Sequence, residues 1–193
     1  MDNAKIITGL ENKHFVSVLL KMLVLAGVTC SCHPEKNKLI DLENIRTTTT
    51  DASELFFKNV RQSDYLLQEN AEAKMNLFQL RDWPDSSLAS VKIVINWYTD
   101  NAYLMFTLNP PLDPQQGFTL VARSDDEELR TYFQPSNVRL QIEACATVYN
   151  HIKQNHKLEI RQGDISLPFL EDAEARAALR ITVFDYLRLV ELR

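Results

Sequence analysis

The chain has 193 residues, with 21 basic and 26 acidic side chains and a formal net charge of −5. This length is typical of one domain with at most a small appendage. Binding to a phosphate backbone requires clustered Lys and Arg, so an acidic chain is not expected to have a nucleic-acid partner. The sequence has only four glycines, which are too scattered to form a phosphate-binding loop. Nucleotide-dependent enzymes with such loops are therefore excluded.

Residues 1–32 have the three parts of an export signal: a basic start, a short apolar middle, and an end of small and polar residues. The apolar middle is FVSVLLKMLVLAGV, residues 15–28, and it contains Lys21. A spanning helix needs about 20 apolar residues, and a lysine near its centre costs roughly 2.5 to 3.5 kcal/mol. A signal segment is therefore favoured over a permanent membrane span.

This segment ends in TCSC, so the small residue Ser31 directly precedes Cys32. In the bacterial lipobox, a small residue precedes the cysteine that receives a diacylglyceryl chain and becomes the new N-terminus. On this motif alone, the segment resembles the signals of uncharacterised bacterial envelope lipoproteins. The resemblance implies lipid attachment at Cys32, with Cys30 as the alternative. It also implies anchoring to membrane lipid in the cell envelope, with the domain outside the cytoplasm.

The chain then divides into a polar tether over 33–50 and a single α+β domain over 51–193. Without residues 1–32 the chain keeps 18 basic and 24 acidic side chains, so its net charge becomes −6. Cys145 is the only cysteine in the predicted domain, which leaves neither a disulfide framework nor a cysteine-based metal cluster.

Five segments before residue 123 are predicted to be strands: 53–67, 75–81, 91–98, 102–108 and 118–122. The first is ambiguous, because Asp51 and Glu54 also have capping-box spacing for a helix. The third and fourth form a β-hairpin, with Val91, Ile93, Ile95 and Trp97 alternating on one face. Segment 102–108 is apolar on both faces, which predicts a central position in the sheet.

Residues 124–128, SDDEE, have the pattern of a helix start, with Ser124 as N-cap and acidic groups near the positive end of the helix dipole. That interpretation is favoured over a cation site. Residues 138–152 have the clearest helical periodicity, with an apolar stripe that has Cys145 at its middle. A thiol in such a stripe is expected to be buried and unreactive.

The chain continues with a short strand over 157–161 and a second helix after Pro168. The apolar stripe of this helix is predicted to be Leu170, Ala173, Ala177, Ile181 and Phe184. Residues 185–193 could extend the helix or form a last strand. The predicted fold is an antiparallel sheet of about five strands, with the two C-terminal helices packed on one face.

The leading hypothesis is a non-enzymatic envelope lipoprotein with a binding or scaffolding role. One alternative is a hydrolase-type acid–base enzyme, which requires two surface carboxylates, or His151 and a carboxylate, to converge. The available carboxylates are Asp82, Asp85, Asp113 and Glu159. The other alternative is a soluble cytosolic protein with an ordinary N-terminal helix.

The two histidines near the end of the first helix are a weak hint of a metal site. His151 and His156 are five residues apart, which does not place two imidazoles on one helical face, so both are expected to be solvated. No catalytic residue, metal ligand or cofactor is assigned from the sequence.

Overall fold

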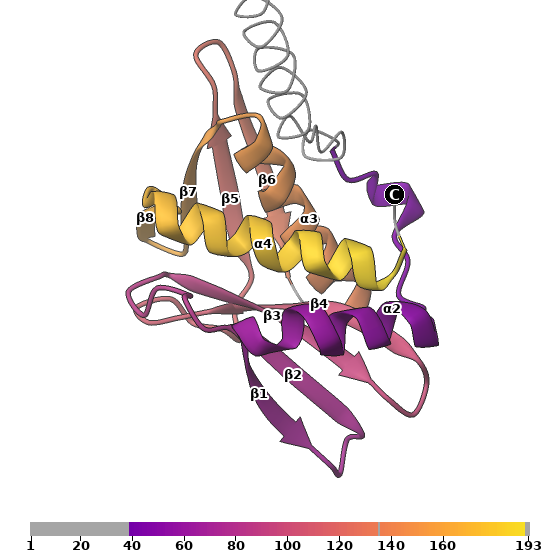
Figure 1. The fold of residues 1–193 in the computed structure, drawn as a ribbon. Coiled ribbons are helices and arrows are strands. Elements are labelled where there is room, and N and C mark those ends of the chain that lie inside the picture. The colour runs from indigo at the N-terminus through magenta and orange to yellow at the C-terminus, as the bar shows by residue number, and fades with distance from the viewer. Residues whose placement is uncertain (1–38, 135, 192–193) are drawn as a thin grey trace, which may run out of the picture. The chain divides into compact units, whose positions relative to one another are not determined.

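The computed structural model describes residues 39–134 and 136–191, which form an α+β fold, as predicted (Figure 1). Its strands are divided between two four-stranded antiparallel sheets, of order β1-β2-β3-β4 and β6-β5-β7-β8. The prediction of a single sheet of about five strands was wrong. β1 overlaps only the last three residues of the predicted strand 53–67. β6 lies where a helix was predicted to start, and β8 lies between the predicted strand 157–161 and the helix predicted after Pro168.

The first sheet contains β1 (Tyr65–Asn70), β2 (Met75–Leu80), β3 (Ala89–Asn96) and β4 (Asn101–Leu108), and the second contains β5 (Phe118–Arg123), β6 (Glu128–Phe133), β7 (Lys157–Gln162) and β8 (Ile165–Phe169). The α-helices of the described residues are α2 (Asp51–Phe56), α3 (Val138–Lys153) and α4 (Ala173–Leu189). Directly after α2 the chain continues through the π-helical turn η3 (Phe57–Arg61) and the 3₁₀ turn η4 (Gln62–Asp64). A short 3₁₀ turn, η2 (Leu42–Asn44), precedes them.

The hairpin of β3 and β4 is the best-predicted part of the fold. Val91, Ile93 and Ile95 are buried on one face, as their alternation predicts. Trp97 does not share that face, because it lies in the turn after β3, where its ring is 44% exposed and Lys74 Nζ is 5.1 Å from its centre. The predicted burial of Trp97 with these residues was wrong, because β3 ends one residue earlier, at Asn96.

β4 lies at the edge of its sheet rather than at the centre. Its outer edge is covered from elsewhere in the chain, since the Phe106 amide donates to Gln141 Oε1 of α3 (2.7 Å) and the Ala102 amide donates to the Thr47 carbonyl (2.7 Å). One face of β4, with Ala102, Leu104, Phe106 and Leu108, is buried, while Tyr103 and Met105 on the other face are only half-buried, so the apolar composition did not indicate a central strand.

Residues 51–64 are helical, although a strand was predicted over 53–67. The capping box lies one residue earlier than predicted: Thr50 Oγ1 accepts from the Ser53 amide (3.2 Å), and Ser53 Oγ accepts from the Thr50 amide (3.1 Å). Two reciprocal caps satisfy amides that a helix start would otherwise leave unpaired. Local capping therefore decides the structure of a segment whose apolar alternation was weak.

The acidic segment 124–128 is a β-turn and not a helix start. The Ser124 amide donates to the Glu127 carbonyl (2.9 Å), and β6 begins at Glu128. Leu129, Thr131 and Phe133 alternate with polar residues at a period of two, which favours a strand directly after the turn. The acidic side chains lie in a hairpin turn, where the dipole argument for a helix cap does not apply.

α4 follows Pro168, as predicted, and it continues to Leu189, so residues 185–189 are helix. The predicted apolar stripe was assigned to the wrong face of this helix. Ala173 and Ala177 are exposed, Ile181 is 40% exposed and Phe184 is half-buried. The buried row is Ala175, Ala178, Leu179, Thr182, Val183, Asp185, Tyr186 and Leu189.

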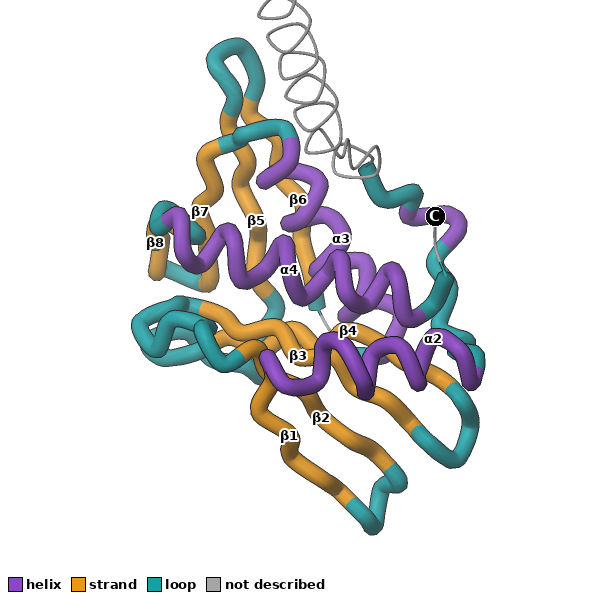
Figure 2. The backbone as a smooth tube through the Cα atoms, viewed as in Figure 1, coloured by secondary structure: helices purple, strands orange, loops and turns teal. Residues whose placement is uncertain are grey.

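Aromatic side chains join the two sheets inside the domain. The rings of Phe106 on β4 and Phe118 on β5 stack with their centres 5.5 Å apart, and Phe106 also contacts Phe169 of β8 edge-on at 6.3 Å. Figure 2 shows the second sheet behind α4 and the first sheet below it. One continuous core therefore serves both sheets and the helices around them.

The part of the predicted tether that the structure describes, residues 39–50, packs against the domain. The Ile40 amide donates to Asn150 Oδ1 of α3 (2.8 Å), and the Asn150 side-chain amide donates back to the Ile40 carbonyl (2.9 Å). The Tyr186 hydroxyl donates to the Arg46 carbonyl, and Thr49 is buried. Residues 40–50 of the predicted tether therefore contact the domain, and residues 33–38 lie outside the described residues.

Candidate functional site

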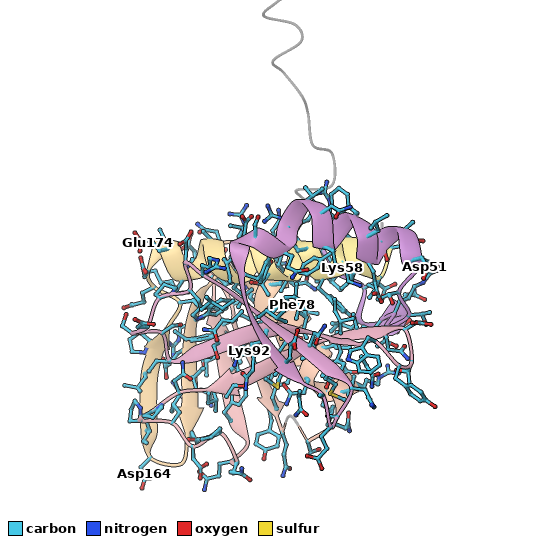
Figure 3. The ribbon with its side chains drawn as sticks, turned by 60° about the horizontal axis from the view of Figure 1, so that its bottom comes forward. Asp51, Lys58, Phe78, Lys92, Asp164 and Glu174 are labelled. Carbon is cyan, nitrogen blue, oxygen red and sulfur yellow. The ribbon has the colours of Figure 1, made fainter. Side chains whose placement is uncertain are left out.

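The most distinctive surface of the domain is formed by α2 and α4, which run antiparallel and in contact. The Ser53 hydroxyl donates to the Leu189 carbonyl (2.7 Å), and farther along α2 the Arg61 side chain reaches Asp185 of α4. Figure 3 shows both helices on the side of the domain marked by Lys58 and Glu174, with Asp164 on the opposite side. Side chains that point outward from the two helices therefore form one surface.

We call this surface the α2–α4 face and define it by Phe56, Val60, Ile181, Phe184 and Arg188. Three of its apolar side chains are strongly exposed, with Phe56 at 43%, Val60 at 52% and Ile181 at 40%. Single exposed apolar residues are common on protein surfaces, but neighbouring ones on two packed helices form a patch. Such patches are typical of surfaces that bind another molecule.

Arg188 organises the aromatic part of the α2–α4 face. Its guanidinium carbon is 4.7 Å from the ring centre of Phe184 and 5.6 Å from that of Phe56. A guanidinium over aromatic rings is held by the ring quadrupole and keeps its charge available to solvent. The face thus combines apolar rings with a fixed positive charge.

A buried ion pair holds the two helices in this arrangement. Asp185 is 3% exposed and accepts two hydrogen bonds from Arg61 Nε, at 3.0 and 2.9 Å, and one from the Tyr65 hydroxyl at 2.7 Å. Burial, with the Asp185 charge second, raises the pKa of Tyr65 well above its ordinary value. Arg61 also pairs with the exposed Asp64 at 2.7 Å. Asp185 and Tyr65 are thus buried within a network whose Arg61 side chain is 26% exposed, and the network links the η3 turn to α4 beneath the face.

The sequence analysis missed the α2–α4 face, although it identified two of its residues. Ile181 and Phe184 belonged to the stripe that was predicted to be buried. The signal was present, because α4 has apolar residues on two sides, more than one core-facing stripe requires. The sequence could not place Phe56 and Val60 near these residues, because it does not show that α2 packs against α4.

The four predicted carboxylates do not converge. Asp82 and Asp85 are exposed in the loop after β2, and Asp113 is exposed in the loop after β4, where its Oδ1 accepts from the Gln115 amide (2.8 Å). A hollow of about 270 Å³ beside Asp85 is also lined by Lys92, and within the described part of the chain it contains none of the other three. The pair of carboxylates that the hydrolase hypothesis requires is not assembled there.

Glu159 lies on β7 and is committed to a local charge cluster on the second sheet. Hydrogen bonds from Arg161, Ser166 and Arg123, in that order of effect, hold the pKa of Glu159 at about 2. A carboxylate stabilised in this way keeps its negative charge at neutral pH and is a poor proton donor. Its role is to tie β5, β7 and β8 together.

Contrary to the prediction, His151 and His156 meet, and His151 is only 9% exposed. The helix ends at Lys153, and Asn155 adopts a positive φ of 59°, which turns the chain so that the His156 amide donates to the His151 carbonyl (3.0 Å). The two Nδ1 atoms are then 3.0 Å apart. The turn after the helix joins them, so helical spacing was the wrong criterion.

The stability of the domain should decrease as pH falls below about 6.5. Burial, with the nearby His156 second, lowers the pKa of His151 below its ordinary value of 6.5. Below that value the unfolded chain binds a proton that the folded chain resists, so the free energy of unfolding declines. Urea unfolding midpoints at about pH 7.5 and 5.5 would measure this. The difference between them should shrink in His151→Asn, and an equal difference in both proteins would contradict the assignment.

The structure describes the remaining predicted site residues only in part. Cys145 is fully buried in α3, as predicted, and burial raises the pKa of its thiol far above the ordinary value. The proposed lipid-attachment residues Cys32 and Cys30 lie outside the described residues. Among residues 39–134 and 136–191, no three His, Cys, Asp or Glu side chains gather as metal ligands. None of the described helices is both long and apolar enough to cross a bilayer.

Comparisons with known proteins place the chain in no family. No protein-family model matches the sequence, and neither a curated protein nor a solved structure matches it. Arguments about function therefore depend on the sequence pattern and on the contacts described above.

Proposed function

We propose that this protein is a membrane-anchored envelope lipoprotein whose α+β domain has a binding or scaffolding role. The observation that supports the proposal is the apolar segment 15–28, which is interrupted by Lys21 and is followed by TCSC, with Ser31 directly before Cys32. The lysine disfavours a permanent span, and the small residue before Cys32 fits acylation. Several acyl chains on one N-terminus anchor a protein firmly, whereas a single chain binds reversibly.

The contacts of the domain support a binding role over an acid–base reaction. The Asp185 carboxylate is satisfied by Arg61 and Tyr65, and Glu159 is held as an anion by its neighbours. The α2–α4 face, in contrast, exposes apolar groups that gain free energy when another surface covers them. Its composition is suited to contact and not to proton transfer.

Acylation is tested by substituting each cysteine of the TCSC motif. Cys32→Ala should abolish the incorporation of labelled fatty acid and leave an unprocessed precursor, because the acceptor sulfur is removed. Cys30→Ala is the matched control and should keep full labelling. If Cys30→Ala alone abolishes labelling, the site lies two residues earlier. If both variants behave as the unchanged chain and the protein fractionates as soluble, the proposed function is wrong.

A further inference from the structure

We propose that the α2–α4 face lies on the surface of an anionic membrane, with Phe56, Val60, Ile181 and Phe184 in the headgroup region and arginines facing the lipid phosphates. This inference rests on the proposed function, because acylation brings the domain to the membrane. It adds which side of the domain contacts the lipid and which lipid chemistry is recognised.

The arrangement of the apolar groups fits a membrane surface. Phe56 at the end of α2 and Val60 in η3 are exposed, as is Ile181 of α4. Arg188 of α4 contacts the rings of both Phe56 and Phe184, which joins the aromatic groups of the two elements. An interfacial helix typically buries its apolar face about 5–10 Å into the boundary between headgroups and acyl chains. Side chains on two packed helices can enter this layer together, without any change in the fold beneath them.

The charges on the same side favour anionic lipid. Arg180 and Arg188 are both exposed and lie one helical turn to either side of Phe184. Of the acids on or next to α2 and α4, Asp185 is buried and paired with Arg61, Glu54 is paired with Lys58, and Glu191 accepts a hydrogen bond from Thr50. Arginine binds phosphate with planar, bidentate geometry, and basic residues near an anionic leaflet are attracted to its negative surface. The chain outside the signal carries a net charge of −6, so this basic row contrasts with the rest of the domain.

Acylation of Cys32 would keep the domain close to the bilayer. Residues 33–38 separate Cys32 from Leu39, the first described residue, which is followed directly by the Ile40–Asn150 hydrogen bonds. At roughly 3.3–3.6 Å per residue, the extended chain from Cys32 to Leu39 reaches no more than about 25 Å. An acylated Cys32 thus keeps the domain near the membrane. Tethering raises the effective concentration of lipid around the α2–α4 face, which favours lipid over a soluble protein as its partner.

The test uses the mature, acylated protein in phosphatidylcholine vesicles with or without phosphatidylglycerol. An environment-sensitive fluorophore is attached under native conditions at Ile181→Cys or, as the matched control, at Asp164→Cys on the opposite side (Figure 3). Cys145 is fully buried and should remain unlabelled. Quenchers carried on the lipid should suppress the label at 181 several-fold more strongly than the label at 164. The difference should be larger in the anionic vesicles.

A charge-reversed protein, Arg180→Glu with Arg188→Glu, supplies the second measurement. Both residues are exposed, and Arg188 loses its contacts with the Phe56 and Phe184 rings, so the unfolding midpoint should decrease only slightly. The folded protein should still float with the vesicles, while quenching at 181 falls to the level seen at 164. Equal quenching at the two positions in the unchanged protein would overturn the inference and leave the anchor intact. Protection of 181 that depends on protein concentration in detergent, without lipid, would overturn it in favour of a second copy of the chain. If the acylated protein does not float at all, the proposed function fails first.

Discussion

Arg61→Ala should lower the free energy of unfolding by about 3–5 kcal/mol, because it leaves a buried carboxylate without its counter-charge. Asp185 is 3% exposed, and without the arginine the Tyr65 hydroxyl would be its remaining hydrogen-bond donor within residues 39–134 and 136–191. Chemical denaturation monitored by circular dichroism would measure the loss as a lower midpoint with an unchanged slope.

Asp64→Ala is the control for this substitution, since it removes the other, 46% exposed partner of Arg61. Exposed ion pairs contribute about 0–1 kcal/mol, so the midpoint should hardly move. Replacing both members of the buried pair, as Arg61→Met with Asp185→Leu, should recover most of the stability lost in Arg61→Ala. If the two single variants, Arg61→Ala and Asp64→Ala, lose the same small amount, the buried pair does not hold α2 on α4.

Phe57→Ala should cost a similar amount, about 3–5 kcal/mol, for a different reason. Phe57 is 2% exposed, and its ring contacts Tyr65 at 5.5 Å and Phe78 at 5.1 Å between centres. Truncation would leave a cavity where η3 packs on the first sheet. The measurement is again the unfolding midpoint in denaturant.

The neighbouring residue provides the matched control. Phe56 is 43% exposed, and its contact with Arg188 is of a kind that contributes about 0.5–1 kcal/mol at exposed sites. Phe56→Ala should therefore keep the fold and weaken only the contacts of the α2–α4 face. Equal destabilisation by the two substitutions would show that the helix is rotated from the position described here.

Local sequence patterns predicted the parts of this fold where the pattern allowed only one type of secondary structure. β3 and α3 have clear periods of two and of three to four, and both were located correctly, including the burial of Cys145. The acidic turn at 124–128 was misassigned, because acids suit both a helix start and a hairpin turn. The alternation in the strand that follows was the discriminating evidence.

The candidate surface could not be predicted because it depends on which face of α4 the core selects. Both sides of this helix are apolar, and the larger row, with Leu179, Val183 and Tyr186, is the buried one. The choice also depends on α2, which was predicted as a strand. Sequence periodicity states that an apolar face exists, but the partner that covers it comes from tertiary packing.

The packing of α2 against α4 also affects how the chain folds. Arg61 and Asp185 are 124 residues apart in the sequence, and Thr50 contacts Glu191 across 141 residues. Contacts at such separations close large loops, which slows folding relative to a chain of local contacts. Arg61 therefore cannot obtain its ion-pair partner until α4 (Ala173–Leu189) is present. A nascent chain that has not reached α4 would hold Arg61 without Asp185, and this part of the fold would be completed only when α4 packs against α2 and η3.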